Sequence, residues 1–122
     1  MLVRESSKAT ETLPTDRLHK VFKIADSYPK DKIVEAFRGQ DAVVNAITGT
    51  QIEEQFRFID AAIEAGVKRY LPSEYGMNNL RPEARQLSSV FDGKGKVQEY
   101  LISKEAAGFT WNAIGCGMWI DW

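Results

Sequence analysis

Hydrophobic residues along this chain follow two spacings, one typical of buried strands and the other typical of amphipathic helices. Mostly apolar runs predict strands at residues 1–4, 18–25, 41–47, 67–71 and 109–114. Helices are predicted at residues 29–37, 52–63 and 93–107. The polar segments 5–16 and 77–90 are predicted as a loop and an irregular stretch. Because the strands alternate with helices, the pattern predicts an α/β fold with a doubly wound, mostly parallel sheet.

Composition narrows the class of protein. The 122 residues, 43% of them hydrophobic, are enough for one small domain with its own core. Because 16 Lys and Arg nearly balance 17 Asp and Glu, nothing indicates a nucleic-acid or anionic-membrane partner. The single cysteine, Cys116, can form neither an internal disulfide nor a metal site, which fits a reducing compartment. No apolar run approaches the roughly 20 residues of a membrane span. We therefore expect a cytoplasmic protein.

The most informative segment is residues 66–76, with the sequence GVKRYLPSEYG. Gly66 is placed to end the preceding helix, and Pro72 prevents the strand that follows from continuing. Ser73 and the residues after it then emerge at the carboxyl end of that strand. In open α/β sheets this edge is where ligands bind.

This segment resembles the corresponding stretch of the NmrA-like and isoflavone-reductase-like proteins, an NADP-binding branch of the short-chain dehydrogenase superfamily, where the pattern is GVKRFxPSEFG. Two further matches, residues 2–7 (LVRESS) and 91–97 (FDGKGKV), lie at the expected distances on either side. The resemblance runs from residue 1 to residue 122. It implies a Rossmann-like fold, NADP as the cofactor and a small-molecule substrate.

Two parts of that family have no counterpart in the sequence: the opening strand with its glycine-rich turn, and the smaller substrate domain. The Gly-x-Gly-x-x-Gly turn would hold the pyrophosphate at a helix N-terminus. We therefore expect residues 1–122 to form a truncated, partial Rossmann-like NAD(P)-binding domain. Without the central first strand, the remaining strands should face a gap that exposes backbone groups and apolar side chains. Such a chain should be weakly active or inactive on its own.

The resemblance assigns cofactor-binding positions to the first two strand ends. Arg4 lies where the family commonly has an arginine that meets the 2′-phosphate of NADP, and a guanidinium can pair two phosphate oxygens. Lys8 lies where the family often has a second basic residue. Asp26 stands where dinucleotide-binding folds often place an adenine-side carboxylate. From spacing alone, Arg4 is also explained as a solvated residue near a terminus, and Asp26 as the start of a turn.

Three further cofactor positions follow the next two strands. Thr48 and Gly49 lie where the family's backbone passes close to the cofactor, and a glycine there allows a close approach. Ser73 occupies the strand end where ordinary short-chain dehydrogenases place a substrate-orienting serine. Local hydrogen bonding in the loop is the simpler explanation of Ser73.

Lys94 is the candidate for catalysis. In isoflavone-reductase-like members the lysine at this place is implicated as an acid/base near the nicotinamide. A lysine can act so only if burial or nearby positive charge lowers its pKa. Val90 stands four residues upstream, where an ordinary short-chain dehydrogenase has tyrosine. Tyr100 and Lys104 do have the Tyr-x-x-x-Lys spacing, but they lie deeper in the predicted helix and are interpreted as structural.

Two functions are compatible with these residues. The first is an NAD(P)H-dependent oxidoreductase of the isoflavone-reductase type by descent, transferring hydride to a small aromatic or enone-type substrate. The second is a non-catalytic regulatory module that senses NADP or binds a partner. Such a module could use the exposed sheet edge to bind a protein partner or a second copy of the chain.

Overall fold

Five short parallel strands form two separate sheets in the computed structural model, which describes residues 1–12, 14–106 and 108–117. The first sheet pairs β1 (Leu2–Arg4) with β2 (Phe22–Ile24). The second has the order β3-β4-β5, with bounds Ala42–Val44, Arg69–Leu71 and Thr110–Trp111. All three of these strand pairings are parallel, as the alternation of strands and helices predicts.

The helices predicted from periodicity are present, with shifted ends. They are α2 (Lys30–Phe37), η2 (Gly49–Glu54) continuing into α3 (Gln55–Glu64), and α5 (Ser89–Lys104). The predicted start of α5 at residue 93 is wrong. The helix begins at Ser89 because the Ser88 hydroxyl caps it, accepting a 3.2 Å hydrogen bond from the Phe91 N–H. None of the described helices has the length and apolar character needed to cross a membrane.

Short helices occupy the segments predicted to lack them. They are α1 (Ala9–Thr12), the 3₁₀ helix η1 (Thr15–Arg17) and α4 (Pro82–Arg85). None is longer than four residues, so none carries the periodicity that identifies a helix in sequence. Pro82 starts α4 at the position where a missing N–H costs nothing.

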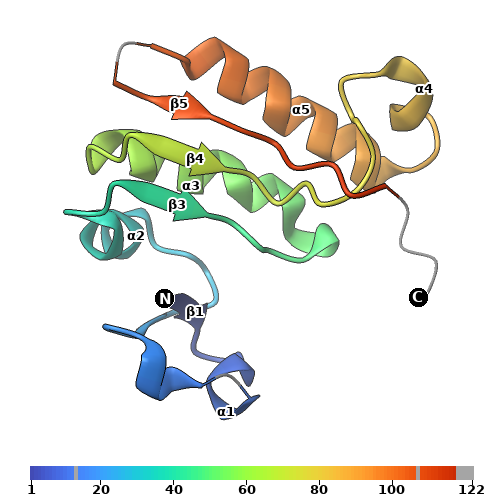
Figure 1. Ribbon diagram of the computed structural model, residues 1–122. Coiled ribbons are helices and arrows are strands. Elements are labelled where there is room, and N and C mark those ends of the chain that lie inside the picture. The colour runs from blue at the N-terminus through green and yellow to red at the C-terminus, as the bar shows by residue number, and fades with distance from the viewer. Residues whose placement is uncertain (13, 107, 118–122) are drawn as a thin grey trace.

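The expected gap in the sheet is confirmed. Within the described residues β1 and β3 do not pair with each other, and Figure 1 shows β1 apart from the β3-β4-β5 sheet. The Val44 side chain of β3 is 65% exposed, an unusual position for a β-branched residue. The strands are also shorter than predicted, since β2 can pair only along the three residues of β1.

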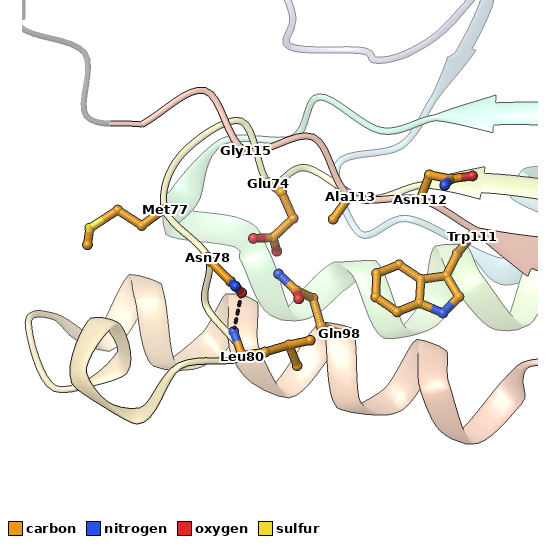
Figure 2. Close-up of a pocket in the computed structure, with 9 residues that line it drawn as sticks. All are labelled: Glu74, Met77, Asn78, Leu80, Gln98, Trp111, Asn112, Ala113 and Gly115. Carbon is orange, nitrogen blue, oxygen red and sulfur yellow. Dashed lines mark hydrogen bonds between the residues drawn. The ribbon is translucent and has the colours of Figure 1, made fainter.

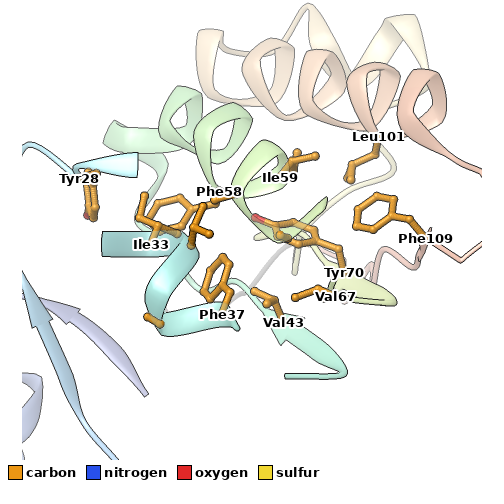
Figure 3. Packing of buried hydrophobic residues seen from close by; sticks show 14 of the residues in the cluster. Tyr28, Ile33, Phe37, Val43, Phe58, Ile59, Val67, Tyr70, Leu101 and Phe109 are labelled. Atoms are coloured by element: carbon orange, nitrogen blue, oxygen red, sulfur yellow. The ribbon is translucent and has the colours of Figure 1, made fainter. Parts of the chain in front are cut away.

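One hydrophobic core joins the two sheets. It lies mainly between the second sheet and helices α2, α3 and α5 (Figure 3), where Tyr70, Ile59 and Leu101 are fully buried. It extends to Ile24 of β2 and to Tyr28, whose ring packs edge-on against Phe58 with centroids 5.1 Å apart. The shared core therefore attaches the first sheet to the second although no strand pairing does.

Candidate functional site

Arg4 and Asp26 lie close together at the carboxyl ends of β1 and β2. The Arg4 Nη1 atom is 3.8 Å from Asp26 Oδ2. Asp26 also accepts two hydrogen bonds from Ser6, one from the backbone N–H at 3.1 Å and one from the hydroxyl. These bonds, more than the charge of Arg4, hold the pKa of Asp26 below its ordinary value. The structure thus brings two predicted cofactor residues together, while Lys8 is exposed in the following loop.

Tyr28 connects this first group of residues to the end of β3. Its hydroxyl donates a 3.2 Å hydrogen bond to Gln51 Oε1 in η2. Arg57 of α3 reinforces the attachment by donating to the backbone carbonyls of Ser27 at 2.6 Å and Tyr28 at 3.0 Å. Tyr28 has a φ of 51°, in the left-handed region that bulky residues rarely adopt. The loop after β2 is therefore tied to the loop after β3.

Ser73 joins the loops that follow β3 and β4. Its hydroxyl donates a 2.8 Å hydrogen bond to the carbonyl of Ile47, and its N–H donates a 2.8 Å bond to Gln55 Oε1. Ser73 and Gln55 are both buried. The predicted local hydrogen bonding of Ser73 within its own loop is therefore wrong, because both bonds reach segments that lie earlier in the chain.

Thr48 and Gly49 lie next to the beginning of α5. Thr48 is exposed, and its carbonyl accepts a 3.0 Å bond from the Gln51 N–H that begins η2. A Cβ atom on Gly49 would lie 3.1 Å from Val90 Cγ1, closer than most side chains tolerate. Gly49 therefore allows α5 to approach the end of β3, which brings Lys94 toward the strand ends.

Lys94 lies near the start of α5 and is directed at the loop after β4. Its ammonium donates a hydrogen bond to the backbone carbonyl of Glu74, the residue that follows Ser73. Burial lowers the pKa of Lys94, and a negative charge on Glu74, where that group is ionised, opposes the shift. A lowered pKa is what a lysine needs to act as an acid or base near neutral pH.

Glu74 is a residue of this site that the sequence did not single out. Its side chain is only 2% exposed, and Asn79 Nδ2 donates a 2.6 Å hydrogen bond to its Oε2. Burial raises the pKa of Glu74, an effect that Asn79, Gln98 and Lys94 oppose. The GVKRYLPSEYG segment places Glu74 near the carboxyl end of a strand, but no sequence pattern indicated that its carboxyl is buried.

A cavity of about 450 Å³ opens beside Glu74. Figure 2 shows the Glu74 carboxyl and the Gln98 amide pointing toward each other in this cavity, with Trp111 along one side. Met77 and Leu80 add apolar surface. The mixture of an aromatic ring, apolar side chains and a few polar groups is typical of small-molecule sites.

Tyr100 and Lys104 take part in the packing of α5 against α3. The Tyr100 hydroxyl donates a 2.7 Å hydrogen bond to Asp60 Oδ1, and Lys104 Nζ lies 3.9 Å from the same atom. Lys104 also lies over the Tyr100 ring, 4.9 Å from its centroid. These contacts provide a structural explanation for the Tyr-x-x-x-Lys spacing.

The chain matches the model of the NmrA-like family over residues 1–117. It is 38% identical over 102 residues to the oxidoreductase aprR of Aspergillus flavus, covering 83% of this chain and 34% of that protein. It is 36% identical over 87 residues to phenylcoumaran benzylic ether reductase PT1 of Pinus taeda, covering 69% of this chain and 28% of that protein. The chain thus spans about a third or less of the length of these relatives.

Solved structures of reductases have the same fold. The structure described as that of pinoresinol-lariciresinol and phenylcoumaran benzylic ether reductases matches 96% of this chain and 40% of its own, with a TM-score of 0.74 and 26% identity. The protein AtPrR2, solved with NADP+ and (+)pinoresinol, matches 92% of this chain and 39% of its own, with a TM-score of 0.70 and 27% identity. The partial Rossmann-like fold is thereby confirmed, and the chain belongs to the NmrA-like family.

Proposed function

We propose that residues 1–122 form part of an NADP-binding domain of an isoflavone-reductase-like oxidoreductase. The observation that carries this proposal is the position of Lys94. It is partly buried at the carboxyl edge of the parallel strands, with its pKa lowered and its ammonium directed at the Glu74 carbonyl. A lysine so placed can hold or release a proton beside a ligand bound at that edge.

The residues at the carboxyl ends of the strands fit NADP, from the ends of β1 and β2 to the region of Lys94. Arg4 is a third exposed, and its 3.8 Å separation from Asp26 is longer than a hydrogen bond, so its guanidinium can pair with a phosphate. Arg4 and Lys8 would hold the 2′-phosphate, and Asp26 would lie on the adenosine side. Thr48, Gly49 and Ser73 would border the path from there to Lys94. When bound, the nicotinamide would supply the hydride.

The substrate class is a small aromatic or enone-type molecule. The support comes from the relatives, which include a protein solved with (+)pinoresinol and a phenylcoumaran benzylic ether reductase. The cavity next to Glu74, with Trp111 along its side, provides aromatic surface near Lys94. Because the chain spans a minor part of its relatives, we expect binding to survive better than turnover.

Calorimetric titration with NADPH, after a cooperative thermal melt has been recorded, tests the proposal. We expect micromolar binding by the wild-type chain and no loss of affinity in Lys94→Met, whose change should appear only in hydride transfer. Lys104→Met is the matched control because Lys104 lies on the same helix and contacts Asp60. If the folded chain does not bind NADPH, the proposed cofactor role of this chain is wrong.

A second function is favoured by the divided sheet. The edges of β1 and β3 that face the gap carry backbone groups that no strand pairs among the described residues, and Val44 is largely exposed there. An extended segment of a partner or of a second copy could add a strand at such an edge. The chain would then act as a regulatory module that senses NADP or binds a partner.

Sizing with light scattering over a wide range of protein concentration tests strand addition by a second copy. We expect the wild-type chain to dimerise as its concentration rises and Val44→Lys to remain monomeric, since an edge lysine prevents strand pairing. Ile102→Lys is the matched control, because Ile102 is half-exposed but lies on α5. If Val44→Lys dimerises as the wild-type chain does, the β3 edge is not the dimer interface.

A further inference from the structure

The Glu74 carboxyl is buried with few groups to stabilise a negative charge. Its side chain is 2% exposed, and Oε2 accepts a 2.6 Å hydrogen bond from Asn79. Oε1 is buried and makes no hydrogen bond within the described part of the chain, although the Gln98 amide faces the carboxyl and opposes the rise of its pKa. An ionised carboxylate that is buried usually needs two or three donors or a paired cation.

Lys94 is the cation whose charge acts on this carboxyl, yet it forms no ion pair with it among the described residues. The Lys94 ammonium donates to the backbone carbonyl of Glu74 instead. None of the ion pairs formed by the described residues includes Glu74. The carbonyl therefore fixes the position of Lys94, and the side chain of the same residue does not serve as its counter-ion.

We propose that Glu74 is a positioning residue for Lys94 whose side chain remains protonated at neutral pH, so that Lys94 is held in place without a neighbouring negative charge. This inference rests on the acid–base role proposed above for Lys94. It adds two roles for Glu74. The main-chain carbonyl of Glu74 fixes the position of the Lys94 ammonium. The uncharged side chain of Glu74 leaves the pKa of Lys94 low, so that Lys94 loses its proton more easily.

The surrounding charges agree with a neutral Glu74. Lys94, from α5, is the charged group that acts on it, while Asn79 and Gln98 contribute neutral amides. Arg85, from α4, lies against Gly95 beside Asn79, but it is already paired with Asp92 and Glu99. Burial is the largest influence on the pKa of Glu74 and raises it.

The consequence for Lys94 can be measured without cofactor or substrate. An ionised carboxylate within a few ångströms raises the pKa of a lysine by about 1 or more, whereas a neutral carboxyl leaves burial to lower it. Replacing Glu74 by glutamine keeps the shape and removes any charge. The pKa of Lys94 reports the charge of Glu74 at the pH where Lys94 itself titrates, so the protonation state of Glu74 at neutral pH is measured on the Glu74 carboxyl.

The experiment is a carbon NMR titration of the side-chain carboxyls in the full chain, with the Glu74 signal assigned through Glu74→Gln. We expect the Glu74 carboxyl to be protonated at pH 7 and to lose its proton only at higher pH. Asp92 is the control in the same spectra, because hydrogen bonds from Lys96 and Arg85 lower its pKa. Its carboxyl should stay ionised into the acidic range.

A protonated Glu74 carboxyl at pH 7 supports the proposal. An ionised carboxyl at pH 7 overturns it and identifies Glu74 as a counter-ion of Lys94. If Glu74→Gln does not fold, Glu74→Asp provides the assignment. Failure of NADPH binding would leave this titration unaffected, so it tests the proposed function separately.

Discussion

The guanidinium of Arg4 lies 3.8 Å from the carboxylate of Asp26, so the predicted phosphate-binding residue has a negative charge as its neighbour. Both side chains are partly exposed, and such a pair contributes little to stability. The pair of Arg4 and Asp26 instead affects the preference of the site for NADPH or NADH. A 2′-phosphate that approaches Arg4 would also approach Asp26, whose pKa is lowered and which is therefore ionised at neutral pH.

Replacing Asp26 by asparagine should strengthen NADPH binding. The variant removes the repulsion of the 2′-phosphate and retains a side-chain oxygen for the Ser6 N–H, which now donates at 3.1 Å. We expect NADPH affinity to rise by about two- to fivefold, with NADH affinity unchanged or lower. Calorimetry with both cofactors measures this ratio. An equal change for NADPH and NADH would show that Asp26 does not face the 2′-position.

Replacing Arg4 by methionine should weaken NADPH binding by about tenfold or more, since charge-assisted hydrogen bonds to phosphate are lost. NADH binding should be nearly unaffected, because NADH carries no 2′-phosphate. Arg17→Met, at an exposed arginine of η1, controls for a general loss of positive charge. The same loss in Arg4→Met and Arg17→Met would contradict a specific role for Arg4.

Two glycines of α5 should resist substitution by alanine. A Cβ on Gly95 would lie 2.6 Å from the Asn79 carbonyl, and one on Gly93 would lie 2.7 Å from Ile52 Cγ2. Overpacking costs about 1–3 kcal/mol of unfolding free energy, which outweighs the better helix propensity of alanine. We expect Gly95→Ala to be the more damaging, because a backbone carbonyl cannot rotate away as a side chain can.

Denaturant unfolding of both variants measures these costs. Gly76→Ala is the control, since its Cβ would lie 3.6 Å from the Glu74 carbonyl in ordinary contact. Stability of Gly95→Ala equal to that of Gly76→Ala would show that α5 and the loop at Asn79 can move apart to make room for a methyl group.

The unfolding free energy should depend on pH through Glu74. Burial raises the pKa of Glu74 above its ordinary value of 4.5. The unfolded chain therefore releases this proton more readily than the folded chain. The stability that Glu74 contributes is fully present below pH 4.5 and is lost as pH rises through the folded-state pKa.

Glu74→Gln should remove that contribution to the pH dependence. The difference in unfolding free energy between the variant and the wild type should shift in favour of the variant as pH rises. Denaturant unfolding at acidic and neutral pH measures the difference, in which all other titrating groups cancel. A difference that does not change with pH would mean that the pKa of Glu74 is the same in the folded and unfolded chains.

Tyr100→Phe should affect stability and leave cofactor binding unchanged. The variant loses the 2.7 Å hydrogen bond to Asp60, which contributes about 1 kcal/mol. The edge-on packing of the ring against Phe56, with centroids 5.1 Å apart, is retained. Thermal melts and NADPH calorimetry measure the two properties. Loss of NADPH binding in a folded variant would show that Tyr100 is part of the cofactor site and does not have a structural role alone.

The sequence by itself determined the order of the strands and of the longer helices, and the parallel pairing. Those features depend on local periodicity and on helix-ending residues such as Gly66. The gap beside β1 followed from the resemblance to the NmrA-like family, whose first strand has no counterpart in the sequence. The sequence also located the strand-end segments that carry Arg4, Ser73 and Lys94, whose roles in binding and catalysis stay predictions. It could not indicate α1 and α4, which are too short to show a period.

Tertiary structure alone decided how the site residues are arranged. The proximity of Arg4 to Asp26, the bonds of Ser73 to Ile47 and Gln55, and the burial of Glu74 each depend on segments many residues apart. Lys94 acquires its lowered pKa only because α5 packs over the loop after β4. Burial and electric fields arise from side chains that meet in space, and spacing along the chain does not specify which distant groups will meet.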